Sequence, residues 1–188
     1  MRRDDLDAPA TRVWDALVET RGDDLIGEDG ALRGPFNAWV HAPQLGEILT
    51  RLGHALRYDT SVDRRLVETA IITVGARYRA EFEWWAHSRM AGQHGVTDGV
   101  VDAIRAGTDP APAGAPDDEL VVHRVAAQLA ASGRVDEDAY TAAVDLLGER
   151  GVVELVTLCG YYCLVCVTLN AFEVPLPPGA TPAWPPSP

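Results

Sequence analysis

Residues 64–87 read RRLVETAIITVGARYRAEFEWWAH, and their pattern decides the fold. The first part repeats apolar residues at helical spacing, and the second part continues as another helix. The short break near Tyr78 allows the two helices, expected at 62–77 and 80–94, to pack as an antiparallel hairpin. On the first helix, the side chains expected to face a core are Leu66, Ala70, Ile71 and Val74.

Helical patterns continue on both sides of this hairpin, and no stretch shows the pattern of a strand. A linker rich in proline, alanine and glycine at 108–117 separates two halves that look distantly alike. We therefore expect an all-α protein, with one helical domain over residues 1–174 and a proline-rich tail over 175–188 that lies extended over a surface or a neighbouring subunit. The further helices are expected at 9–20, from Pro43 to about 57, from Thr97 to Gly107, at 118–131, from Asp136 to about 149, and at 152–172.

Two of these helices carry long apolar patterns. The segment from Leu155 to Ala171 contains no charged residue and approaches the length of a membrane span. It also contains polar residues and has no basic flank, so it is expected to be a buried central helix that contributes to an oligomer interface. The helix that starts at Pro43 is expected to turn one apolar stripe toward the core: Leu45, Ile48, Leu49, Leu52 and Leu56.

Composition and charge argue against several classes of function. A net charge of −12 disfavours nucleic acid and an anionic membrane surface as partners, although a local pair of arginines can still hold an anionic substrate. The N-terminus lacks the apolar segment of a signal peptide. The three cysteines, Cys159, Cys163 and Cys166, are odd in number and clustered, so they do not form a disulfide framework. A reduced, cytoplasmic protein is expected.

Glu68, Glu83 and His87 are the residues best suited to carry chemistry. Glu68 lies among apolar neighbours, so its carboxylate needs a partner, and a salt bridge alone would satisfy it. Glu83 and His87 are four residues apart on one helix face, where the carboxylate can orient the imidazole and raise its pKa. The alternative for His87 is ordinary packing in the core. The arginines that could neutralise Glu68 are Arg64, Arg65 and Arg77.

Other chemical motifs are absent or weak. The chain has no GxGxxG, P-loop or HExxH motif, and its five histidines do not occur at metal-ligand spacing, so neither a cofactor nor a metal is expected. Cys163 and Cys166 form a CxxC by spacing. They lie inside an apolar helix, where burial raises the pKa of a thiol, so packing rather than redox chemistry is expected. Trp84 and Trp85 point to different sides of their helix, and either can wall a pocket.

Taken together, these residues resemble the carboxymuconolactone decarboxylase family, which includes the AhpD-type alkylhydroperoxidases. The resemblance covers about residues 30–176 and implies an AhpD-like helical bundle. It also implies assembly as a homo-oligomer, a trimer or hexamer, with sites near subunit interfaces. The stretches that carry the resemblance are GPFNAWVHAPQLGEILTRLGHALR, RRLVETAIITVGARYRAEFEWWAH, AGQHGVTDGVVDAIRAG and LNAFEVPLP.

The resemblance also separates two branches of this family. AhpD-type members carry a Cys-x-x-Cys-x-x-x-His motif, with a glutamate twelve residues before the first cysteine. When His87 is set as the histidine of this motif, Glu68 takes the position of the glutamate, whereas Ala80 and Glu83 replace the two cysteines. A thiol peroxidase is therefore the least expected function.

The non-redox branch resembles γ-carboxymuconolactone decarboxylase, in which a lactone acid loses CO₂ and a dienolate carbon is then protonated. The resemblance implies a cofactor-free enzyme acting on a small carboxylated or lactone substrate, with His87 as the proton donor and Glu83 or Glu68 holding its tautomer. The alternative is a non-catalytic oligomer that binds a small ligand. The expected substrate-binding residues are Arg77 or Arg79 for the carboxylate, together with Tyr78 and Trp84.

Overall fold

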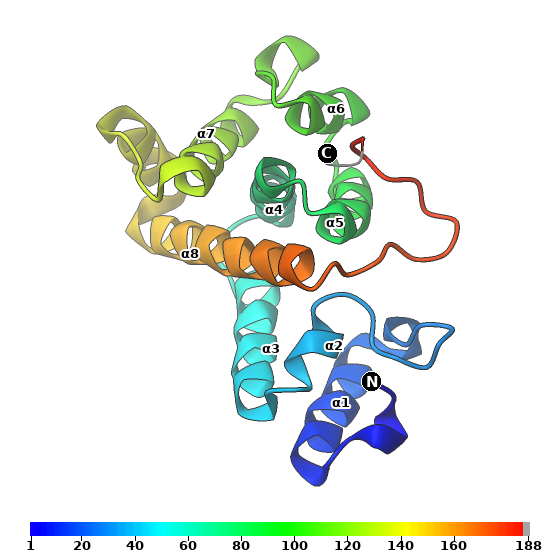
Figure 1. The fold of residues 1–188 in the computed structure, drawn as a ribbon. Helices are drawn as coiled ribbons and strands as arrows, with labels where there is room; N and C mark the ends of the chain where they lie inside the picture. The colour runs from blue at the N-terminus through cyan, green and yellow to red at the C-terminus, as the bar shows by residue number, and fades with distance from the viewer. Residues whose placement is uncertain (186–188) are drawn as a thin grey trace.

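Helix α4 (Arg64–Tyr78) is the central element of the computed structural model, which describes residues 1–185 (Figure 1). Every residue from Leu66 to Gly75 is buried, because small and apolar side chains surround the helix and neighbouring helices pack on all its sides. The all-α prediction is confirmed, since the described residues form helices and no strand. The helices around α4 are α5 (Glu81–Gln93), α6 (Asp98–Ala106), α7 (Asp117–Ser132) and α8 (Glu137–Ala171).

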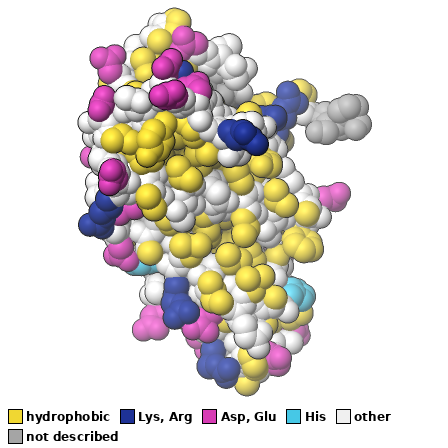
Figure 2. Space-filling model, turned by 90° about the vertical axis from the view of Figure 1, so that its left-hand side faces the viewer, with side chains coloured by type: hydrophobic (Ala, Val, Ile, Leu, Met, Phe, Trp, Pro, Cys, Tyr) yellow, Lys and Arg dark blue, Asp and Glu magenta, His cyan; other side chains and the backbone are white. Residues whose placement is uncertain are grey.

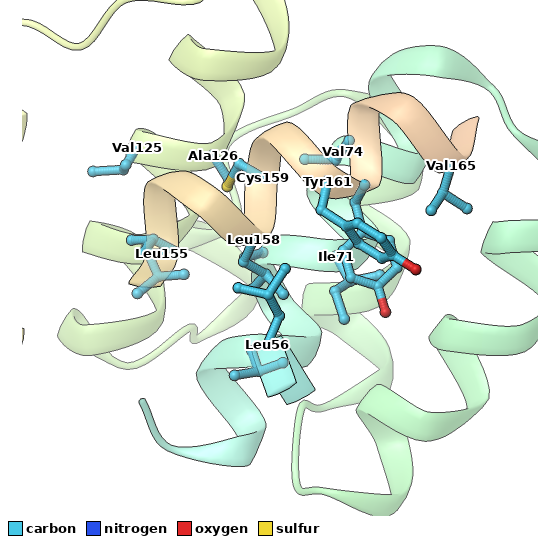
Figure 3. Close-up of a cluster of buried hydrophobic side chains, with 14 of the residues drawn as sticks. Leu56, Ile71, Val74, Val125, Ala126, Leu155, Leu158, Cys159, Tyr161 and Val165 are labelled. Carbon is cyan, nitrogen blue, oxygen red and sulfur yellow. The ribbon is translucent and has the colours of Figure 1, made fainter. Parts of the chain in front are cut away.

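The main hydrophobic core lies where α4, α7 and α8 meet the end of α3 (Pro43–Tyr58). Each fully buried aliphatic side chain in such a core contributes roughly 1.5–3 kcal/mol relative to exposure. Figure 3 shows how the side chains from these four helices interlock: Leu56, Ile71, Val74, Val125, Ala126, Leu155, Leu158, Cys159, Tyr161 and Val165.

The expected α4–α5 hairpin is present. Helix α4 ends at Tyr78, and Arg79 takes a left-handed conformation with a φ of 47° that reverses the chain. The backbone N–H of Ala80 then bonds to the carbonyl of Gly75 at 3.1 Å, which closes the turn. Helix α5 therefore runs back along α4 and ends two residues before Gly95, whose φ of 99° requires glycine.

Helix α8 consists of two helical segments joined at Gly148, whose φ of 69° and ψ of 170° are not helical. The sequence predicted a boundary between two helices near residue 149, and the structure places it at Gly148. The second segment is not the buried central helix that we expected, because only one of its faces packs on the core. Its opposite face exposes Val153, Val156, Leu164 and Val167.

By length and composition, α8 is the one helix in residues 1–185 that is apolar enough to cross a membrane. Half of its most apolar window is buried inside the protein, as in the core helix of a soluble domain. The length and composition of α8 are those of a helix that crosses a membrane and equally those of a helix that packs in a protein core.

The N-terminal region forms a second, smaller core beside α3. Helix α1 (Ala8–Arg21) and the short helix α2 (Phe36–Trp39) enclose this core, whose buried members are Ala10, Val13, Trp14, Leu17, Leu32 and Val40. The stripe predicted on α3 is only partly buried. Leu49 and Leu56 face inward beside Gly46 and Gly53, where α3 approaches its neighbours closely, whereas the outward members are exposed: Leu45, Ile48 and Leu52.

The C-terminal tail runs along the surface from the end of α8, past α5, toward α6 (Figure 1). It is anchored at its far end, because Glu81 accepts hydrogen bonds from the backbone N–H groups of Ala183 and Trp184 at 2.7 and 3.0 Å. The Trp184 ring packs edge to face on Trp84, with ring centroids 5.3 Å apart. An extended tail on a surface was predicted, and its last residues, 186–188, lie outside the described part.

Candidate active site

The α4–α5 hairpin brings Glu68, Glu83 and His87 into direct contact. Glu68 lies in the second turn of α4, and the antiparallel course of α5 places His87 opposite it. Nδ1 of His87 is 2.7 Å from Oε2 of Glu68, and Nε2 is 3.0 Å from Oε1 of Glu83. All three side chains are buried. The predicted convergence of these residues is therefore seen in the structure.

The two contacts of the imidazole differ in kind. The contact with Glu68 is a hydrogen bond. Oε1 of Glu83 makes no hydrogen bond of good geometry, so its contact with Nε2 is electrostatic. The imidazole is thus fixed on the Glu68 side and held more loosely on the Glu83 side.

Arg64 supplies the second partner of Glu68. Its guanidinium nitrogen is 2.5 Å from Oε1 of Glu68, one helical turn away on α4. The salt bridge considered from sequence is therefore present, and it coexists with the contact to His87. The other two candidate arginines are elsewhere, since Arg65 pairs with acidic residues of α7 and Arg77 is exposed.

Burial and charge act in opposite directions on His87. Burial alone lowers the pKa of the imidazole, but the carboxylates of Glu83 and Glu68 favour the charged form and raise its pKa to about 9. Burial likewise raises the pKa of Glu68, but His87 and Arg64 outweigh it and bring that pKa below its usual value. At neutral pH the imidazole of His87 is therefore protonated and faces the ionised Glu68, with Arg64 behind Glu68.

A partly open cavity of about 260 Å³ lies beside this group. Glu83 and His87 line it, whereas Glu68 does not and lies behind the imidazole. The expectation that all three residues share one pocket is therefore wrong for Glu68. Because Nε2 contacts Glu83 and Nδ1 contacts Glu68, Nε2 is the nitrogen on the cavity side. Aromatic side chains form the largest group in the remaining wall: Phe36, Trp39, Phe82, Trp85, Tyr161 and Tyr162.

Two aromatic residues of α8 shape the floor of this cavity. The ring of Tyr162 packs edge to face on His87, with centroids 5.3 Å apart. The hydroxyl of Tyr161 donates a hydrogen bond to the carbonyl of Leu49 at 3.1 Å, which ties α8 to α3. These contacts hold the imidazole in a rigid apolar setting on the side away from the carboxylates.

Three arginines reach the same cavity: Arg21 from the end of α1, Arg33 from the following loop and Arg57 from α3. Within the described residues, Arg21 and Arg57 form no salt bridge. Arg57 is 8% exposed, and its Nε donates to the carbonyl of Gly53 at 3.2 Å. The guanidinium of Arg21 lies 4.7 Å from the centre of the Phe36 ring. A buried guanidinium without a carboxylate partner is suited to bind an anionic ligand.

The structure does not bring the other predicted binding residues to this cavity. Arg77 and Arg79 are exposed at the turn end of the hairpin. Arg77 is nine residues from Glu68, or roughly 13 Å along the helix axis. Tyr78 lines a different hollow, next to Cys163, and Trp84 faces the tail instead of the ligand space. Trp85, the other tryptophan of the pair, lines the cavity.

Sequence reasoning missed Arg21 and Arg57 because tertiary packing alone brings them to His87. One signal was present in the sequence. Arg57 is four residues after Gly53 and directly follows Leu56, so it continues the inward face of α3. A charged residue on a buried helix face is a candidate for binding or ion pairing.

The cysteines lie apart from this site. None of them lines the cavity. Cys159 and Cys166 are buried, and burial raises the pKa of the Cys159 thiol to about 12. Ala80, at the position of one motif cysteine, is fully buried at the start of α5. Within residues 1–185, no group of three or more ligating side chains has a geometry suited to a metal ion.

Comparison with models of known protein families finds no match, and no curated protein matches the chain. The site itself therefore carries the functional argument.

Proposed function

We propose that this protein is a cofactor-free acid–base enzyme of the carboxymuconolactone decarboxylase type, acting on a small carboxylated or lactone substrate. One observation carries the proposal: the imidazole of His87 lies between Glu83 and Glu68, beside a cavity reached by the buried Arg57 and the half-buried Arg21, neither of which forms a salt bridge within residues 1–185. A proton donor and an anion-binding group are the two elements that decarboxylation followed by carbon protonation requires.

In the proposed reaction, Arg57 and Arg21 bind and orient the anionic substrate. Cleavage of the bond to the carboxyl group releases CO₂ and leaves the electron pair on carbon, delocalised as a dienolate. His87 then donates the proton on Nε2 to that carbon, and solvent returns a proton to the imidazole. The aromatic side chains in the wall give the reacting carbon a partly apolar setting, where charge interactions are stronger than in bulk water.

Glu83 and Glu68 have different roles in this scheme. Glu83 lines the cavity beside Nε2, so it contacts the substrate and guides the proton. Glu68 does not reach the cavity and acts as a positioning residue, which holds Nδ1 while Arg64 holds Glu68 in turn. The chain of contacts from Arg64 to Nε2 keeps the imidazole protonated and correctly oriented.

A non-catalytic ligand-binding protein is the second candidate. It is favoured by the contact of Nε2 with Glu83, because that contact also satisfies a purely structural histidine. Such a protein would bind small carboxylates through Arg57 without converting them. A thiol peroxidase is the weakest candidate, since no cysteine lies in the cavity.

We also propose that the protein forms a homo-oligomer, a trimer or hexamer. The exposed face of α8 and the outward residues of α3 are apolar, and Figure 2 shows hydrophobic side chains spread over the side of the molecule that lies at the left of Figure 1. Apolar surface of this extent commonly marks an interface between copies.

Turnover of small lactone acids, followed as CO₂ release, tests the enzyme proposal. His87→Gln is expected to abolish turnover while acid binding persists. Arg57→Met is expected to weaken acid binding about 10- to 100-fold, because it removes charge-assisted hydrogen bonds. Arg77→Met is the matched control, since this arginine is exposed and outside the cavity.

Three results would contradict parts of this proposal. Acid binding without turnover of any lactone acid would favour the ligand-binding protein. Loss of binding in Arg77→Met, with Arg57→Met unchanged, would place the carboxylate at the turn of the hairpin. Normal turnover in His87→Gln would remove His87 from the chemistry.

A further inference from the structure

A second hollow, a groove of about 870 Å³, adjoins the His87 cavity. One side of the groove is formed by the loop and short helix at residues 27–41, and the other by the start of the C-terminal tail at 172–178. Its lining is largely apolar and includes Leu32, Phe172, Val174 and Leu176. The groove therefore favours an apolar occupant.

The two hollows meet at two side chains. Arg33 and Phe82 line both of them. The backbone at Gly34 approaches Phe82 so closely that a Cβ there would lie 2.8 Å from the ring. The loop therefore rests directly on Phe82, and the partition between groove and cavity is a single layer of side chains at this point.

The His87 cavity alone is small, since ligand pockets in proteins commonly measure about 300–1,000 Å³. At about 260 Å³, it has room for only the carboxylate and the reacting carbon of an acid. The neighbouring groove adds more than three times that volume on the far side of Phe82. A substrate larger than a simple lactone acid would place its remaining part there.

We propose that the groove is a second substrate subsite, which takes the apolar alkyl tail of a carboxylic acid whose polar end lies in the His87 cavity. The inference rests on the proposed function, because Arg57 and Arg21 are what place the carboxylate at the inner end. Arg33 and Phe82 form the junction, with Phe82 contacting the chain where it passes from cavity to groove. The substrate class is accordingly an acid with an apolar chain, rather than a small lactone acid alone.

The anchor of the tail sets the outer wall of this subsite. The wall residues, 172–178, belong to a segment that is held at its far end by Glu81 and by packing of Trp184 on Trp84. The indole N–H of Trp184 also donates to the carbonyl of Arg105 at 3.2 Å. Glu81 and Trp84 lie on α5, the helix that also carries His87. The contacts that anchor the tail therefore hold the outer wall of the groove in a defined position relative to His87.

The test measures the dissociation constants of unbranched saturated monocarboxylates, from butanoate to decanoate, with the full-length protein by calorimetry. In the wild type, the dissociation constant is expected to fall about fourfold for each methylene group that enters the groove. Leu176→Asp puts a charge into the groove, and Trp184→Ala releases its outer wall. Both variants are expected to lose the dependence on chain length while binding butanoate within about twofold of wild type.

Tyr140→Asp is the matched control, because it adds the same charge at an exposed apolar residue of α8 outside both hollows. It is expected to keep the dependence on chain length. A wild type that binds butanoate and decanoate equally, or a dependence that survives in both groove variants, would overturn the inference.

Arg57→Met separates this inference from the proposed function. If both hold, this variant weakens binding of every acid by a similar factor and leaves the dependence on chain length intact. If Arg57→Met leaves all affinities unchanged while Leu176→Asp removes the dependence on chain length, the carboxylate does not bind at Arg57, but the groove still binds the alkyl chain. Failure of every acid to bind would refute both.

Discussion

The pKa of His87 makes the stability of the protein depend on pH in a direction that can be tested. The folded state binds a proton on His87 up to about pH 9, whereas an unfolded histidine releases it near 6.5. The stabilisation that comes from the proton on His87 is fully present below about pH 6.5 and is lost as the pH rises toward 9. A difference of about 2.5 pKa units corresponds to about 3 kcal/mol at pH 6, falling to about 1 kcal/mol at pH 8.5.

The informative variant replaces two residues together. His87→Gln alone would leave Glu68 and Glu83 buried side by side without the imidazole between them, so it would change more than the proton on His87. In Glu83→Gln/His87→Gln, Glu68 keeps its salt bridge to Arg64, while the imidazole and the carboxyl group of Glu83 are both replaced by neutral amides. This double variant is expected to show a nearly flat free energy of unfolding between about pH 6 and 8.5.

Urea unfolding followed by circular dichroism, at a fixed protein concentration and at several pH values, measures the difference. The buried cysteines are present in both proteins, so their titration cancels in the comparison. Equal slopes for the wild type and the double variant would refute the reasoning. So would a nuclear magnetic resonance titration that places the pKa of His87 below 6.5.

Three further outcomes are expected. Gly53→Ala should destabilise the fold by about 1–3 kcal/mol, measured by urea unfolding, because its Cβ would lie 2.7 Å from Cζ of the Tyr161 ring; unchanged stability would show that α3 can shift away from α8. Cys163→Ser should leave any hydroperoxide turnover with a dithiol reductant at the background level of the wild type, and a thiol-dependent activity lost in this variant would revive the peroxidase. Val167→Glu, on the exposed face of α8, should lower the mass measured by light scattering toward the 20.3 kDa monomer, with Glu149→Gln as a surface control; a wild type that is already monomeric would contradict the oligomer proposal.

The helices and the hairpin could be predicted from sequence because their signals are local. Apolar periodicity, proline at the start of α3 and glycines at helix ends each act within a few residues. The contact between Glu83 and His87 follows from their spacing on one helix. The contact between Glu68 and His87 could be predicted only by assuming that α4 and α5 pack antiparallel. The short break between the two helices made this packing predictable.

The anion-binding residues and the exposed face of α8 could not be predicted in the same way. Arg21 and Arg57 reach His87 from helices that precede it by 66 and 30 residues, and no local pattern encodes that approach. On α8, apolar residues surround the helix, so periodicity does not distinguish the face that packs on the core from the face exposed by Val153 and Val167. The sequence predicted the buried central helix at 152–172. In the structure the most buried helix is α4, in which every residue from Leu66 to Gly75 is buried.

The division of labour between the two cores has an evolutionary consequence. His87, Glu68 and Glu83 belong to the α4–α5 hairpin, whereas Arg21 ends a helix that packs mainly in the small N-terminal core. In the enzyme that we propose, substitutions in the first helices would therefore change which anion is accepted without altering the groups that transfer the proton. Descendants of such a protein would diverge in specificity by altering their N-terminal third, with the hairpin inherited unchanged.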